Sequence, residues 1–116
     1  MYEISKTFSF EAAHSLPHLP DGHKCQRVHG HSYRVEIVCR GELDERGFVI
    51  DYAEISEAID PVIKRIDHHF LNDVMPYPTT AENLARWIYE QCMGEIPIWQ
   101  VHVFETAKTR CTFPAR

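Results

Sequence analysis

Two histidines one residue apart, His29 and His31, are the feature of this sequence that points most directly to chemistry. They begin a segment patterned as a β-strand, in which both imidazoles would point to the same face, about 6–7 Å apart along the strand. That spacing allows two nitrogens to converge on one metal ion at bond lengths of about 2.0–2.1 Å. Gly30 between them lets the strand bend at its end. A lone His-x-His is often just two strand histidines, so the interpretation requires a third ligand.

A third histidine stands at the end of the preceding strand-like segment. Residues 4–14 alternate between apolar and polar side chains, and His14 shares the parity of the apolar ones. If this segment pairs antiparallel with the strand that begins at His29, the end of the first lies beside the start of the second. Three imidazoles would then meet at one edge of the sheet, with a fourth position open for water or substrate. The sequence therefore predicts a zinc site on His14, His29 and His31.

Cys25 lies four residues before His29, in a polar segment between Lys24 and Gln26. A thiol beside a divalent cation and a lysine would have substantial thiolate character. It is therefore a candidate general base, or a fourth zinc ligand in the resting state. The alternative is a loop cysteine with no role in catalysis.

The other three cysteines give no sign of a metal or disulfide site. Cys39 and Cys92 fall on apolar stripes and are expected to be buried. No two of the four cysteines, Cys111 included, form a Cys-x-x-Cys motif. We therefore expect four reduced thiols.

Two acidic positions complete the set of candidate residues. Asp67 precedes His68, and a carboxylate beside an imidazole can shuttle protons near neutral pH. The alternative is structural, because Asp and His both suit the exit of a helix. Glu105 lies in an apolar-patterned strand, where a buried acid usually has a ligand or a partner, although the strand end could be solvated.

Periodicity predicts the elements that must position these side chains. The pattern gives two strands, two helices and two strands in chain order, over residues 4–14, 29–40, 51–65, 79–94, 99–105 and 111–113. This β-β-α-α-β-β order predicts an α+β fold in which both helices cover one face of an antiparallel sheet.

Capping residues support the two predicted helices. Asp51 is the expected N-cap of the first helix, with Glu54 as its capping-box partner, and Pro61 should kink that helix. The second helix should begin near Thr79 or Thr80, with Glu82 able to close a capping box to Thr79, and should stop at Gly94.

Length and charge limit the classes of function. A chain of 116 residues predicts one domain, 1–116, with a real hydrophobic core. Twelve basic against 17 acidic residues give a formal net charge of −5, which provides no basic footprint for nucleic acid. No apolar run approaches the roughly 20 residues that span a bilayer, and the N-terminus lacks a signal-peptide pattern. We therefore expect a cytoplasmic protein.

Motifs along nearly the whole chain resemble the 6-pyruvoyltetrahydropterin synthase superfamily. They occur in the family order: Phe8–His14, Cys25-x-x-x-His29-Gly30-His31, Asp67-His68-His69-x-Leu71-Asn72, Pro78–Asn83 and Glu105-Thr106. The three residues between Cys25 and His29 are the pattern of the bacterial 6-carboxy-5,6,7,8-tetrahydropterin synthases of queuosine biosynthesis. The pyruvoyl-forming branch usually has a longer spacing there.

The resemblance implies the T-fold, or tunnelling fold, in which monomers join their sheets into a barrel, commonly as a hexamer built from two trimers. It implies that zinc is held by His14, His29 and His31. It also implies that Cys25 is the catalytic base, and that Asp67 and His68 relay protons from a neighbouring subunit.

The resemblance further implies a pterin substrate anchored by Glu105, with Thr80 helping to hold the ring. The reaction would convert 7,8-dihydroneopterin triphosphate to 6-carboxytetrahydropterin, with release of acetaldehyde and triphosphate. Three residues of the loop, His23, Lys24 and Arg27, are candidates for binding the triphosphate. Two alternatives stay open: a different pterin lyase, pyruvoyl-forming or aldolase-like, and a non-catalytic zinc-binding or pterin-binding module.

Three further histidines have no such partner set. His18, His23 and His102 are therefore expected to be loop or surface residues.

Overall fold

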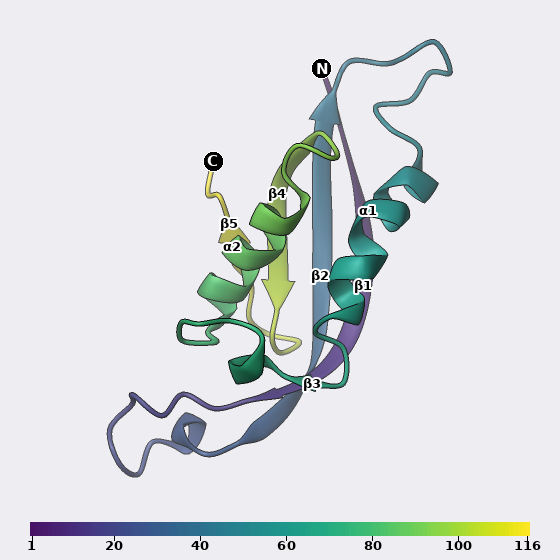
Figure 1. The fold of residues 1–116 in the computed structure, drawn as a ribbon. Helices are drawn as coiled ribbons and strands as arrows, with labels where there is room; N and C mark the ends of the chain where they lie inside the picture. Colours follow the sequence, from purple (N-terminus) through teal and green to yellow (C-terminus); the bar gives the residue numbers. More distant parts are fainter.

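A long antiparallel hairpin is the spine of the computed structural model, which describes all of residues 1–116 (Figure 1). Its strands are β1 (Tyr2–His14) and β2 (His29–Gly41), each of 13 residues. They pair without interruption from Tyr2↔Gly41 to His14↔His29. The predicted pairing of the end of the first strand with the start of the second is confirmed.

Three shorter strands complete one five-stranded sheet in the order β3-β1-β2-β4-β5. Strand β4 (Ile98–Phe104) pairs antiparallel with β2, and β5 (Cys111–Phe113) pairs antiparallel with β4. Strand β3 (His69–Phe70) lies parallel to the end of β1 and was not predicted. Two residues are too few to show alternation, so a sequence pattern could not reveal it.

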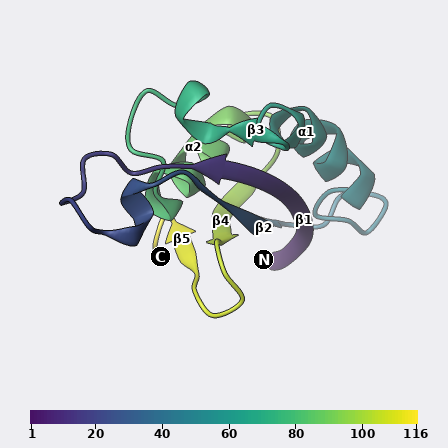
Figure 2. The ribbon, with the colours of Figure 1, turned by 90° about the horizontal axis from the view of Figure 1, so that it is seen from below.

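Two helices, α1 (Tyr52–Lys64) and α2 (Ala81–Cys92), lie on one side of the curved sheet (Figure 2). The predicted α+β class is therefore confirmed. Two turns of 3₁₀-helix, η1 (Lys24–Gln26) and η2 (Leu71–Asp73), lie in the connections. No helix is both long and apolar enough to cross a membrane.

The first helix begins as predicted. The Asp51 side chain accepts a hydrogen bond from the backbone N–H of Ala53 at 2.8 Å, which satisfies a donor that has no partner within the helix. Pro61 does not end the helix, which continues to Lys64. Pro61 lies in the last turn, where its missing N–H removes one hydrogen bond of the helix.

The predicted capping box of the second helix is wrong. Thr80, not Thr79, is the N-cap, and its Oγ1 accepts from the backbone N–H of Asn83 at 3.2 Å. Thr79 is buried and contacts His14 instead.

The hydrophobic core lies between the sheet and the two helices. Alternate side chains of β2 and β4 meet side chains at helical spacing in α1 and α2, and these are fully buried: Val35, Ile37, Cys39, Val101, Val103, Ile55, Ile59, Leu84 and Ile88. Removing this apolar surface from water is the main force that holds the helices on this face.

The opposite face of the sheet is polar. Ser5 bonds to Glu36 at 2.8 Å across the strands, and the His102 ring bonds to the Thr112 hydroxyl through Nδ1 at 2.7 Å. His102, expected to be a loop or surface residue, lies within the strand predicted over 99–105, on this outer face of β4. It is half-buried there, and this burial lowers its pKa.

We predict that native alkylation separates the cysteines by burial. Burial raises the pKa of Cys39 to about 11 and that of Cys92 to about 12, so neither thiol ionises near neutral pH. Cys25 is only half-buried. Iodoacetamide at pH 8, followed by peptide mass spectrometry, should modify Cys25 first and should reach Cys39 and Cys92 only after unfolding in urea. Equal rates for Cys25 and Cys39 in the native protein would contradict this prediction.

Candidate active site at the end of the hairpin

Three histidines meet where the long hairpin ends, at its loop. His14 and His29 are the last paired residues of β1 and β2, and His31 lies two residues further along on the same face. The ring centroids are 4.6 Å apart for His14–His29, 4.9 Å for His29–His31 and 5.2 Å for His14–His31. One nitrogen from each ring lies within 4.8 Å of the other two. The predicted convergence of this histidine cluster is confirmed.

Backbone carbonyls determine which nitrogen carries the proton in two of the rings. His14 Nδ1 lies 2.7 Å from the Thr79 carbonyl oxygen, and His29 Nδ1 lies 2.8 Å from that of Arg27. A carbonyl only accepts, so each Nδ1 is the donor and each Nε2 keeps a free lone pair in the neutral ring. The two Nε2 atoms are 3.0 Å apart. Two lone pairs at that distance repel each other unless a proton or a cation lies between them.

The third ring has a nitrogen without a hydrogen-bond partner. His31 Nε2 is buried and unpaired, and its only charged neighbour is Glu105, whose Oε1 lies 3.4 Å away. Burial lowers the pKa of His31 against the opposing effect of the Glu105 charge, with the other two histidines lowering it further. The ring is therefore neutral at pH 7.

The cluster fits a divalent metal ion. Neutral imidazoles with free lone pairs are the ligands that zinc and similar metals prefer. Two metal–nitrogen bonds of about 2.1 Å span at most about 4.2 Å, so small ring rotations would bring all three nitrogens onto one ion. The bonds from Nδ1 to backbone carbonyls also orient the rings, as is usual for metal-bound histidines.

A cavity of about 400 Å³ lies between the start of α2 and the ends of β4 and β5. Both residues expected to hold a ligand, Glu105 and Thr80, line this cavity. Because Glu105 also contacts His31, the carboxylate links the cavity to the histidine cluster.

Asp67 and His68 form a bonded pair at the edge of β1. His68 Nδ1 lies 2.9 Å from Asp67 Oδ1, and the same oxygen accepts from the backbone N–H of Glu11 at 3.0 Å. The bond from the Glu11 backbone is the main cause of a lowered Asp67 pKa, and the His68 charge contributes. Asp67 is therefore ionised and holds the imidazole in one orientation.

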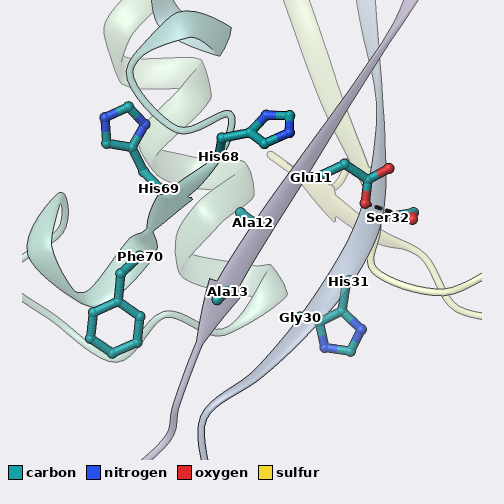
Figure 3. A pocket seen from close by; sticks show the side chains of 9 residues that line it. All are labelled: Glu11, Ala12, Ala13, Gly30, His31, Ser32, His68, His69 and Phe70. Carbon is teal, nitrogen blue, oxygen red and sulfur yellow. Dashed lines mark hydrogen bonds between the residues drawn. The ribbon is translucent and has the colours of Figure 1, made fainter.

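His68 lies at the surface in an uncommon backbone conformation. It adopts φ 58°, in the left-handed region that is uncommon for residues other than glycine, and its backbone N–H donates to the Glu11 carbonyl. Its side chain is 77% exposed. A cavity of about 510 Å³ has both His68 and His31 on its wall, and Figure 3 shows these two residues on either side of β1.

Cys25 is near the cluster in sequence but is not part of it. It lies in η1, where its backbone N–H donates to His23 Nδ1 at 3.1 Å and its carbonyl accepts from Leu16 N–H at 2.9 Å. Its sulfur is not among the donor atoms that lie within 4.8 Å of one another. The structure therefore holds Cys25 in the loop that closes the hairpin, outside the group of nitrogens.

Two residues beside the cluster were not identified from the sequence. Thr79 is buried and contacts His14 Nδ1 through both its carbonyl and its hydroxyl. Tyr33 is buried, its ring centroid lies 5.4 Å from that of His31, and burial raises its pKa. The position of Tyr33, two residues after His31 on the same strand face, was the one signal available.

Comparison with known proteins connects this site to pterin chemistry. The family model described as 6-pyruvoyl tetrahydropterin synthase matches residues 3–116. A 6-carboxy-5,6,7,8-tetrahydropterin synthase from Synechocystis sp. is 38% identical over 123 residues, which cover 100% of this chain and 92% of that protein. A dihydroneopterin monophosphate aldolase from Pyrococcus furiosus is 37% identical over 89 residues, 77% of this chain and 73% of that protein.

The fold is also shared with a solved structure. The 6-pyruvoyl tetrahydropterin synthase of Caenorhabditis elegans superimposes with a TM-score of 0.88 at 27% identity and covers 99% of this chain and 96% of that one. The similarity therefore includes both the sheet and the helices.

We predict that the histidine cluster alone binds the metal. Substituting His31→Ala should lower zinc affinity by at least about 100-fold, because it removes one of three ligands. Cys25→Ala should change it by less than about threefold, since Cys25 lies outside the cluster. Isothermal titration with ZnCl₂ measures both. A comparable loss in the Cys25→Ala variant would show that the thiol is a ligand.

We also predict that the metal-free protein loses stability on acidification. The pKa of His31 is lower in the folded state than the usual value of about 6.5, so the unfolded chain binds more protons just below that pH. The free energy of unfolding should therefore fall between pH 7 and pH 5. Urea unfolding of protein treated with a chelator should show this decline, and His31→Asn should reduce its slope. An unchanged slope in that variant would contradict the prediction.

Proposed function

Because the chain belongs to the 6-pyruvoyl tetrahydropterin synthase family, we propose that it is a zinc-dependent carbon–carbon lyase of pterin metabolism. Its substrate would be 7,8-dihydroneopterin triphosphate and its product 6-carboxy-5,6,7,8-tetrahydropterin, with acetaldehyde and triphosphate released in queuosine biosynthesis. The observation that carries this proposal is the histidine cluster, with free lone pairs converging beside Glu105. The Cys25-x-x-x-His29 spacing and the Synechocystis relative support the carboxy-forming reaction.

His14, His29 and His31 would hold the zinc ion. When bound, zinc would act as a Lewis acid that polarises side-chain oxygens of the substrate and acidifies the adjacent C–H bond. Three protein ligands leave a coordination position open, as in catalytic rather than structural zinc sites.

Cys25 would remove a proton from the substrate side chain. The thiol is half-buried in η1, in the loop between the two strands that carry the histidine cluster. A thiolate there would be close to the zinc without being one of its ligands, which suits a general base. His23, Lys24 and Arg27 are exposed on the same loop and are candidates to bind the triphosphate.

Asp67 and His68 would transfer protons as the triphosphate leaves. Asp67 accepts from Nδ1, so Nε2 of the same ring is left to exchange a proton with the substrate. Because the His68 side chain is exposed, we propose that it acts in the site of a neighbouring subunit.

Glu105 and Thr80 would hold the pterin ring in the cavity of about 400 Å³. A carboxylate accepts two parallel hydrogen bonds, which matches the adjacent amino and ring N–H donors of a pterin. The contact between Glu105 and His31 would place the reacting side chain of the pterin next to the zinc.

The open edge of the sheet supports assembly into a barrel. Strand β3 covers only Ala12 and Ala13 of β1, so the outer edge from Tyr2 to Ser9 has no strand beside it. Such edges pair readily with another chain. We propose that residues 1–116 act as one T-fold domain in a cytoplasmic homohexamer of two trimers, with sites at subunit interfaces. The four free thiols are consistent with a reducing compartment.

A second candidate is an aldolase that acts on a pterin with fewer phosphates. The Pyrococcus furiosus relative named dihydroneopterin monophosphate aldolase favours this alternative. Both reactions need a base and an electrophile near the same side chain, so the histidine cluster alone does not discriminate between them.

We predict that product analysis identifies the reaction. Incubation with 7,8-dihydroneopterin triphosphate, followed by mass spectrometry, should yield 6-carboxytetrahydropterin and acetaldehyde. A pyruvoyl pterin would assign the sister activity, and a hydroxymethyl pterin with glycolaldehyde triphosphate would assign the aldolase. No conversion, with zinc and pterin bound, would favour a binding module.

The Cys25→Ala variant is the matched control for the same assay. It should lose at least about 1,000-fold in kcat while keeping its zinc, because the base is removed and the metal ligands are not. Full activity would exclude Cys25 as the base.

A further inference from the structure

The hydroxyl of Tyr33 is buried without a hydrogen-bond partner. The side chain is 2% exposed, and its ring stacks on Phe10 with a centroid separation of 4.8 Å and an interplanar angle of 6°. The ring is therefore firmly placed. A buried hydroxyl with nothing to bond costs stability, and a phenylalanine would pack in the same way without that cost. The hydroxyl needs an explanation that packing does not supply.

The sheet register places Glu105 across from Tyr33 on the neighbouring strand. Arg34 of β2 pairs with Phe104 of β4, so the next opposite positions on the two strands are Tyr33 and Glu105. Opposite residues of antiparallel strands have Cβ atoms about 4.5–5.5 Å apart, on the same face of the sheet. His31 shares that face and lies two residues from Tyr33. The Glu105 side chain therefore lies on the same face of the sheet as two potential donors of β2, His31 and Tyr33.

In the structure Glu105 is directed to the first of these donors. Its Oε1 lies 3.4 Å from His31 Nε2, a contact that requires a proton on that nitrogen to be favourable. A metal bound to the histidine cluster takes the lone pair of Nε2, which then has no proton to donate. A metal bound through this nitrogen would therefore leave His31 unable to donate to Glu105, and the other unpaired donor on this face of β2 is the Tyr33 hydroxyl.

We propose that Tyr33 is a positioning residue that donates its hydroxyl proton to Glu105 when the histidine cluster holds its metal. This inference rests on the proposed function, in which Glu105 anchors the pterin. One hydrogen bond from Tyr33 would fix the carboxylate and leave its remaining lone pairs for the N–H donors of the ring. Metal binding and pterin binding are thereby coupled through one side chain.

Tyr33→Phe tests the proposal, because it removes the hydroxyl and keeps the ring that stacks on Phe10. Tyr89→Phe is the matched control, since Tyr89 packs against Phe113, away from the histidine cluster. Equilibrium dialysis with neopterin should be carried out on zinc-loaded and on metal-free protein. In zinc-loaded protein Tyr33→Phe should weaken neopterin binding about tenfold, the loss expected for one hydrogen bond to a charged group. In metal-free protein the loss should be less than about twofold, with zinc affinity unchanged.

Equal neopterin affinity of wild-type and Tyr33→Phe protein in the zinc-loaded state would overturn the inference. So would an equal loss in both metal states, which would indicate packing rather than a metal-dependent contact. Wild-type protein that takes up zinc but no neopterin would instead overturn the proposed function.

A crystal structure of the zinc-loaded wild-type protein gives a second readout that does not depend on the variant. A distance below about 3 Å from Tyr33 Oη to a Glu105 oxygen supports the proposal, because that is hydrogen-bond contact. A separation above about 4 Å overturns it.

Discussion

The register of the β1–β2 hairpin is the constraint on which the rest of the site depends. It makes His14 and His29 the terminal pair and brings their Nε2 atoms to 3.0 Å. A shift by one residue would turn every side chain of one strand to the other face, which would separate the histidines and expose the apolar core positions at once. The burial of Val35 and Ile37 therefore also determines where the three histidines meet.

The surroundings of each group in the site explain what it can offer a ligand. His14 and His29 are bonded through Nδ1 to backbone carbonyls, so their Nε2 atoms face each other with free lone pairs in the neutral rings. Asp67 is exposed and accepts from a backbone N–H, so it stays ionised and orients His68. Glu105 lies between the histidine cluster and the cavity of about 400 Å³, because it contacts His31 and also lines that cavity.

Local patterns predicted the elements well because alternation and helical spacing report burial directly. The parity of His14 with Phe10 was enough to place it on the face of β1 that meets the other two histidines. The same reasoning failed for Thr79, which resembles a helix cap in sequence but bonds to His14, 65 residues away. It also failed for β3, whose two residues pair with β1 next to the bonds that Asp67 and His68 make with the backbone of Glu11.

The sequence by itself determined the residue types, the strand parity and the spacing, and so the kind of chemistry this chain can carry out. Only the tertiary structure decided that His31 faces Glu105, that Thr79 orients His14, and that the Tyr33 hydroxyl lacks a partner. The physical reason is that these contacts join residues far apart in the chain. Periodicity records which face of an element is buried, whereas a hydrogen bond between elements depends on how their faces meet in three dimensions.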